Sequence, residues 1–125
     1  MRKKLDLHYE SPQGYFSLTW SEYRGEGVGH DDETYDFVLH VLRNYRTGEI
    51  VGFSNDGGEL GKDYERIMKL LAEKPIAERY DVPALDLYDA TIGEIITTLY
   101  RRFVLGEKTL AERKAPAPEA ADSAG

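Results

Sequence analysis

The chain has 125 residues, enough for one domain, and its 41% hydrophobic content is ordinary for a small globular core. Its net charge of −7 disfavours binding to a phosphate backbone, and the absence of cysteine excludes disulfides and thiolate zinc sites. No apolar run is long enough to span a bilayer, and the charged N-terminus has no apolar signal segment, which predicts a cytoplasmic protein.

Two segments near the N-terminus show the alternation of half-buried strands. Their apolar positions are Leu5, Leu7, Tyr9, Phe16, Leu18 and Trp20. Between them, Ser11-Pro12-Gln13-Gly14 has the composition of a β-turn, because proline presets φ and glycine tolerates a positive φ. The two strands are therefore predicted to form a hairpin.

A second hairpin is predicted after a polar, glycine-rich loop at residues 24–34. Residues 35–41 alternate like a strand, residues 46–49 form a turn, and residues 50–53 resume a strand. Because short connections favour antiparallel neighbours, the four strands are predicted to form an antiparallel meander. The third strand is apolar on both sides, which is typical of a central strand or of a sheet shared between subunits.

Two helices are predicted to follow the strands. The first covers residues 62–73 and ends before Pro75, and residues 77–88 are predicted to form a linker. The second begins at Thr91-Ile92-Gly93-Glu94, which matches a capping box. Its apolar stripe consists of Ile92, Ile95, Ile96, Leu99 and Phe103.

The predicted fold class is therefore α+β, a four-stranded antiparallel meander followed by two helices packed on one face. This single domain is expected to cover residues 1–113. The alanine- and proline-rich residues 114–125 offer almost nothing large to bury, which predicts a disordered tail.

No catalytic constellation is recognisable in the sequence. The serines lack the glycine context of a nucleophile elbow, and the glycine-rich loop is followed by acidic residues rather than by a helix and a lysine. The spacings of calcium and zinc ligands are also missing. We therefore predict no catalytic residue, no metal ligand and no cofactor, which favours a protein that is not an enzyme.

The loop at residues 24–34 and the aromatic residues before it are the candidate binding residues. Histidine beside carboxylates can act as a base or bind a cation, and aromatic side chains on a sheet can stack on a ligand. The candidates are Trp20, Tyr23, Arg24, His30, Asp31 and Asp32.

The stretch Thr47-Gly48-Glu49-Ile50-Val51-Gly52-Phe53 resembles the DUF2283 family of small bacterial proteins. The shared pattern is a strand, a polar turn with glycine, and a valine–glycine pair that leads into a short apolar strand. The resemblance covers about residues 35–55. It implies a largely uncharacterised family in which some members are suspected antitoxins, encoded beside small toxins, and for which no catalytic residues are established.

These observations favour a small acidic cytoplasmic protein that interacts with a protein partner, in a regulatory and antitoxin-like role. A basic partner, such as a ribonuclease toxin, would suit the negative charge. The alternative is a small-ligand-binding protein or enzyme that uses residues 24–34. A nucleic-acid-binding module that uses the basic residues 2–4 and 101–102 is disfavoured by the charge. A homodimer through a sheet edge is a further alternative.

Overall fold

The computed structural model describes residues 2–24 and 27–107, so the predicted tail at residues 114–125 lies outside the described residues. The elements in chain order are β1 Lys3–Glu10, β2 Tyr15–Trp20, β3 Val28–Asp31, β4 His40–Asn44, β5 Ile50–Ser54, α1 Leu60–Glu73, β6 Arg79–Val82, the 3₁₀ turn η1 Pro83–Leu85, β7 Leu87–Thr91, α2 Ile92–Leu99 and the π-helical turn η2 Tyr100–Val104. Among these described segments, no helix has the length and hydrophobicity needed to cross a membrane.

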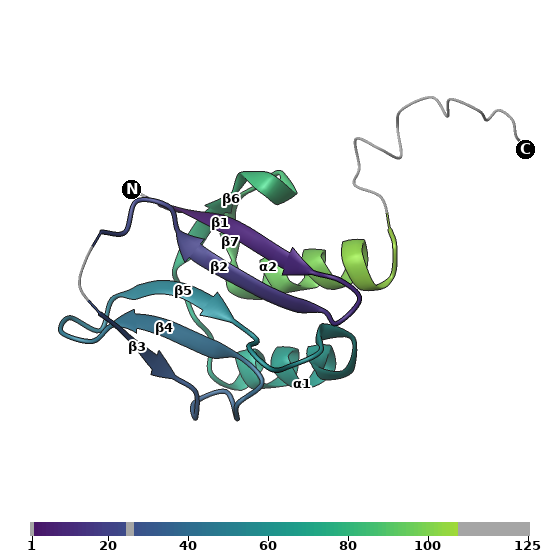
Figure 1. Cartoon of the computed structure of the whole chain (residues 1–125), viewed down its shortest axis with the longest axis horizontal. Coiled ribbons are helices and arrows are strands. Elements are labelled where there is room, and N and C mark those ends of the chain that lie inside the picture. The colour runs from purple at the N-terminus through teal and green to yellow at the C-terminus, as the bar shows by residue number, and fades with distance from the viewer. Residues whose placement is uncertain (1, 25–26, 108–125) are drawn as a thin grey trace, which may run out of the picture.

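The strands form one seven-stranded mixed sheet in the order β3-β4-β5-β2-β1-β6-β7 (Figure 1). The predicted four-stranded antiparallel meander is therefore wrong. β2 pairs with β5 rather than with the next strand in the chain, and β1 pairs in parallel with β6. The predicted first hairpin is confirmed, with Leu7 opposite Leu18 and Tyr9 opposite Phe16.

Three local predictions are also wrong. Residues 35–39 form a turn instead of a strand, because Asp36 and Phe37 both adopt a left-handed backbone conformation, with φ of 53° and 63°. Four residues of the predicted loop, Val28–Asp31, form the edge strand β3. The predicted linker at residues 77–88 contains β6 and the start of β7, which extend the sheet at its other edge.

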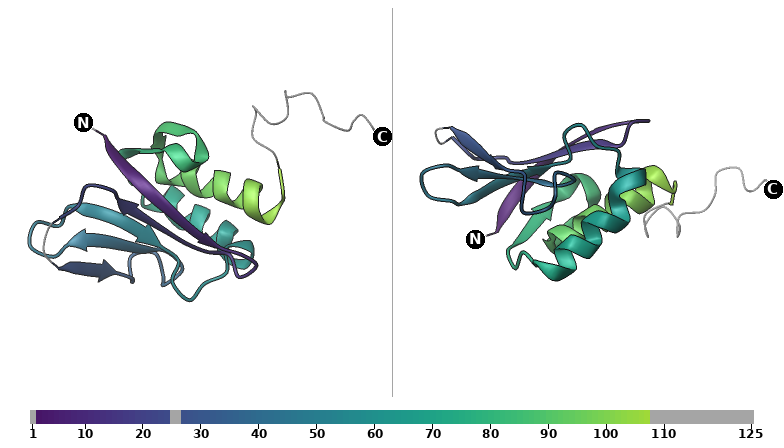
Figure 2. Two further views of the ribbon diagram at one scale, coloured as in Figure 1. Left: turned by 45° about the horizontal axis from the view of Figure 1, so that its top comes forward. Right: turned by 90° about the horizontal axis from the view of Figure 1, so that it is seen from below.

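Both helices lie on the same face of the sheet, as the views of Figure 2 show. We call this side the helix face, and the core lies between it and the two helices. The buried residues of the helix face include Leu5, Phe16, Leu18, Val41, Phe53 and Tyr80. They pack with Ile67 of α1 and with Ile92, Ile95, Ile96 and Leu99 of α2, which confirms the predicted stripe over these four residues. Phe103 is 41% exposed in η2 and stacks on Tyr9 at 4.4 Å.

The opposite side of the sheet, which we call the open face, is not covered by either helix (Figure 2). Directly opposed residues of paired strands point to the same face. The register therefore assigns Lys4, Asp6, His8, Ser17, Thr19, His30, His40, Leu42 and Ser54 to the open face. The fold thus leaves one side of the sheet without a covering helix.

Gly52 of β5 lies in the middle of this open face. A Cβ atom at this position would lie 2.4 Å from the backbone oxygen of Leu18 and 3.2 Å from a methyl group of Leu42. The glycine of the valine–glycine pair thus allows β5 to approach β2 closely. The next residue towards the turn, Val51, has no partner in β4, because the register shifts between Leu42 and Arg43.

The capping box of α2 is confirmed. The Thr91 hydroxyl accepts a hydrogen bond from the Glu94 amide at 3.2 Å, and the Glu94 carboxylate accepts one from the Thr91 amide at 2.9 Å. Both interactions satisfy backbone donors that a helix N-terminus leaves unpaired.

We expect Thr91→Ala to lower the free energy of unfolding by about 1 kcal/mol, because an unpaired helix N-cap costs about that much. Urea denaturation of the full chain measures this loss. Thr98→Ala is the matched control, because its hydroxyl only donates to the Glu94 carbonyl within the helix. Equal losses in the two variants would contradict a stabilising role for the cap.

Candidate acidic binding site on the open face

An acidic hollow of about 360 Å³ opens where the β1–β2 hairpin meets the loop between β5 and α1. The residues around it are Glu10, Gln13, Tyr15, Asp56, Gly57, Gly58 and Glu59. Three of these residues are carboxylic acids, and none is lysine or arginine. Tyr15 is half-buried and lies opposite Glu10 in the hairpin, so that it forms an aromatic wall beside the carboxylates.

Asn55 holds the β5–α1 loop in place. This side chain is 1% exposed, and its Oδ1 accepts a hydrogen bond from the Phe16 amide at 2.7 Å. Its Nδ2 donates to the Gly14 carbonyl at 2.8 Å, and its own carbonyl accepts from the Gly58 amide. Gly57 adopts a positive φ of 78°, which completes the turn between Asp56 and Glu59. The β1–β2 hairpin and the β5–α1 loop form the two sides of the hollow, and both are therefore fixed to the buried residue Asn55.

Two histidines of the open face border the hollow. His8 Nε2 lies 2.8 Å from a carboxylate oxygen of Glu10, and the His8 ring contacts the Tyr15 ring edge-on at 6.1 Å. His40 Nε2 lies 3.3 Å from the Asp56 carbonyl oxygen, and His40 Nδ1 lies 2.6 Å from Asp32. The His40 ring thus links the loop between β3 and β4 to the edge of the hollow.

The carboxylates of the hollow remain accessible to a binding partner. Lys62 pairs with Glu59 at 3.4 Å, but the Lys62 side chain is 78% exposed and this contact is a weak surface ion pair. Among the described residues, no group of three or more His, Asp or Glu side chains is close enough to hold a metal ion. A hollow of this size with three carboxylates and a tyrosine has the chemistry to accept an ammonium or guanidinium group.

The structure does not bring the six predicted binding residues together. His30 is exposed on the open face, whereas Asp31 is opposite Val41 on the helix face. Asp31 accepts hydrogen bonds from the amide and hydroxyl of Thr34, and Asp32 contacts His40. Of the six, only Asp32 approaches the hollow, and it does so through His40.

Trp20, Tyr23 and Arg24 lie near the start of β1. The Trp20 and Tyr23 rings are 6.0 Å apart, and the Lys3 ammonium lies 5.0 Å from the centre of the Trp20 ring. The Arg24 guanidinium donates to the backbone carbonyls of Ser21 and Tyr23. These contacts stabilise the turn after β2.

Two of the N-terminal basic residues, Arg2 and Lys3, are engaged in ion pairs. Lys3 is 7% exposed, and its ammonium lies 2.8 Å from Glu78 and 3.3 Å from Glu49. The Tyr80 hydroxyl also donates to Glu78 at 2.8 Å. Burial, followed by this hydrogen bond, raises the pKa of Tyr80 well above its usual range. Arg2 pairs with Asp81 at 2.8 Å, and the hydrogen bond from Arg2 lowers the pKa of Asp81.

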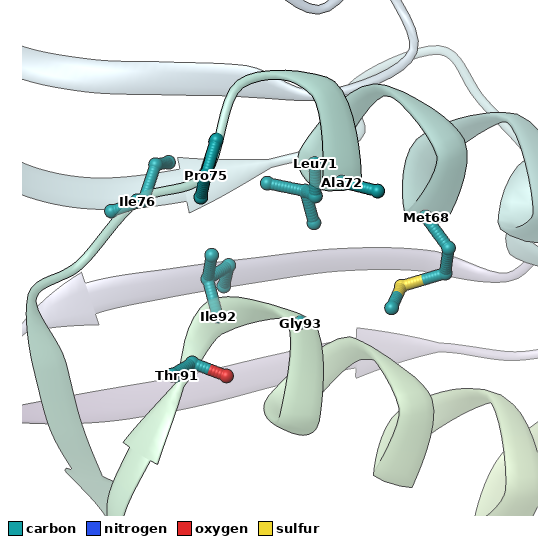
Figure 3. A pocket seen from close by; sticks show the side chains of 8 residues that line it. All are labelled: Met68, Leu71, Ala72, Pro75, Ile76, Thr91, Ile92 and Gly93. Atoms are coloured by element: carbon teal, nitrogen blue, oxygen red, sulfur yellow. The ribbon is translucent and has the colours of Figure 1, made fainter.

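A second hollow of about 250 Å³ lies between α1 and the start of α2 (Figure 3). Apolar side chains of Met68, Leu71, Ile76 and Ile92 line it, and Thr91 is the one polar side chain among its lining residues. Because the Thr91 hydroxyl already accepts the Glu94 amide, this hollow offers a ligand little polar recognition.

Sequence reasoning missed Glu10, Tyr15, Asp56 and Glu59 as site residues. The signal available was the acidic, glycine-containing stretch Asp56-Gly57-Gly58-Glu59, which is also what an ordinary turn looks like. This stretch comes to lie beside the β1–β2 hairpin because β2 pairs with β5.

Comparison with known proteins found no match to a family model, to a curated protein or to a solved structure. The resemblance to DUF2283 therefore stays a hypothesis that rests on the quoted residues alone.

Proposed function

We propose that the protein is a small regulatory protein that binds a basic protein partner through the acidic hollow, in an antitoxin-like role. The observation that supports this most is the hollow itself, with three carboxylates and one tyrosine on an uncovered sheet face. A lysine or arginine side chain of the partner would enter the hollow, where charge-assisted hydrogen bonds to Glu10, Asp56 and Glu59 hold it.

The overall charge supports the same proposal. With 23 acidic and 16 basic residues, the chain attracts cationic proteins, which accelerates their encounter with it. The contacts do not support the alternative, a small-ligand site at residues 24–34. The side chains of Asp31, Asp32 and Arg24 form hydrogen bonds to neighbouring groups of the same chain.

Neutralising the hollow tests this function. We expect Glu10→Gln, Asp56→Asn and Glu59→Gln together to weaken partner binding about tenfold or more, since each charge pair contributes to both encounter and affinity. The partner is captured by affinity purification of the tagged full chain from its native cells and is identified by mass spectrometry. Titration calorimetry with the purified partner then gives the Kd of each variant.

A matched variant separates the hollow from net charge. Glu65→Gln, Glu73→Gln and Glu107→Gln together remove the same three charges from exposed positions elsewhere. We expect this control to bind nearly as well as the unmodified chain. Equal weakening by both triple variants would show that the hollow is not the binding surface, and a captured partner without a basic surface would contradict the proposed function.

A further inference from the structure

The two edges of the sheet differ in how their backbone groups are used. At the β7 edge, Asp89 has a left-handed φ of 57°, its amide donates to Asp81, and its carbonyl accepts from Arg79. Such irregular, charged edges prevent the addition of a further strand. At the other edge, β3 pairs regularly with β4, with no bulge, no proline and no lysine.

The outward-facing groups of β3 can be identified from the neighbouring strand. The Asn44 amide donates to Glu49, and the Asn44 carbonyl accepts from Gly48, so that the polar groups of Asn44 face away from β3. Because these groups alternate in direction along a strand, Arg43 and Val41 direct theirs towards β3. Gly29 and Asp31 are opposite these two residues. The N–H and C=O groups of Val28 and His30 therefore point outward.

In the described part of the chain, no hydrogen bond reaches these outward groups. Val28 is 39% exposed, and His30 is also exposed. An exposed edge with two residues ready to pair is a template for another strand.

We propose that two copies of the chain pair antiparallel through β3, about a twofold axis that passes between Gly29 of one copy and Gly29 of the other. In this register Val28 lies opposite His30 of the second copy. The outward groups of each residue then meet those of the other, which forms four hydrogen bonds between the copies. The two sheets become one continuous sheet, with both open faces on the same side.

The side chains around β3 fit this arrangement. A Cβ atom on Gly29 would be 3.4 Å from the Cβ of Tyr45, and one on Gly27 would be 2.4 Å from its ring. The Tyr45 side chain thus lies over the two glycines at the edge while remaining 65% exposed. In the dimer, each exposed Tyr45 ring lies over the Gly27 end of the newly paired strand, where it adds apolar contact area to the interface.

Charge complementarity favours a second copy over an unrelated strand. Arg46 lies in the turn after Asn44, the partner of Val28, and Asp32 and Glu33 directly follow Asp31 at the other end of β3. Antiparallel pairing brings Arg46 of each copy towards the carboxylates of the other, and the twofold axis repeats this contact.

The substitution His30→Pro tests the pairing, because the N–H of His30 points outward and β4 does not need it. We expect the full chain at about 100 µM to have twice its chain mass of 14.2 kDa by light scattering, as a dimer of micromolar Kd would. His30→Pro should be monomeric with an unchanged circular dichroism spectrum, whereas His30→Ala, which keeps the N–H, should remain a dimer. A monomeric unmodified chain, or a dimer that His30→Pro does not dissociate, would refute the proposal.

Cross-linking gives an answer even if the proline variant fails to fold. The chain contains no cysteine. In the proposed dimer the two Gly29 residues face each other as a non-hydrogen-bonded pair, in which the Cα atoms lie about 4.5 Å apart, within disulfide range. We expect Gly29→Cys to form a covalent dimer rapidly on oxidation, whereas Lys69→Cys, exposed on α1, should stay largely monomeric. Equal cross-linking of both variants would exclude the proposed axis.

Discussion

Asn55→Ala is expected to lower the free energy of unfolding by about 3 kcal/mol, because a buried donor loses its partner. Without the Asn55 side chain, the Phe16 amide loses its acceptor at 2.7 Å, and the Gly14 carbonyl keeps only the Leu60 amide. No water reaches these groups easily, since Gly14, Phe16 and Asn55 are all buried. Urea denaturation, followed by the fluorescence of Trp20, measures the loss.

Asn44→Ala is the matched control. The Asn44 side chain also accepts two backbone hydrogen bonds, from Arg46 at 2.9 Å and Thr47 at 3.3 Å, but it does so in an exposed turn. Water can replace these bonds, so a loss below about 1 kcal/mol is expected. If both variants lost the same stability, burial would not be the reason for the effect at Asn55.

Gly52→Ala is expected to cost about 3 kcal/mol, at the upper end of the range for overpacked cores. The added methyl group would overlap the Leu18 carbonyl, a backbone atom that can move only if β2 and β5 separate. Thermal denaturation by calorimetry measures the resulting fall in Tm. The same variant tests why the valine–glycine pair is present in the sequence.

Gly61→Ala provides the comparison for Gly52. At this position in α1 a Cβ atom meets only Val104, at an ordinary 3.5 Å. Alanine favours a helix more than glycine does, so we expect a gain of about 0.5 kcal/mol. Opposite signs for the two substitutions would show that close strand approach, rather than glycine content, determines the effect. Equal signs would contradict this explanation.

The parts of the fold that follow from local pattern could be predicted. The hairpin of β1 and β2 has strict alternation and a proline–glycine turn, and α2 carries its own capping box. Residues 35–39 also alternate, but contacts distant in the chain overrule the pattern. The Tyr35 hydroxyl donates to the Lys74 carbonyl, and Asp36 pairs with Arg66 of α1.

The strands β6 and β7 could not be recognised as easily, because each is short and Pro83 separates them. Arg79-Tyr80-Asp81-Val82 does alternate between exposed and buried positions, but four residues give a weak signal. The acidic hollow depends on strand order. Glu10 and Asp56 come together because β2 lies between β1 and β5, an arrangement that no local pattern specifies.

The parallel pairing of β1 with β6 has a consequence for how the protein folds during synthesis. Every strand from β1 to β5 can pair with a neighbour once the chain has been synthesised as far as Ser54. The pairing of Lys3 in β1 with Tyr80 in β6 is possible only after Tyr80 has been synthesised. Contacts so distant in the chain form late, since closing a long loop is entropically costly. The first five strands can therefore pair as an antiparallel sheet before β6 is made, and in that sheet β1 is an edge strand. The synthesis of β6 provides the partner that covers the β1 edge, and β7 then completes the sheet.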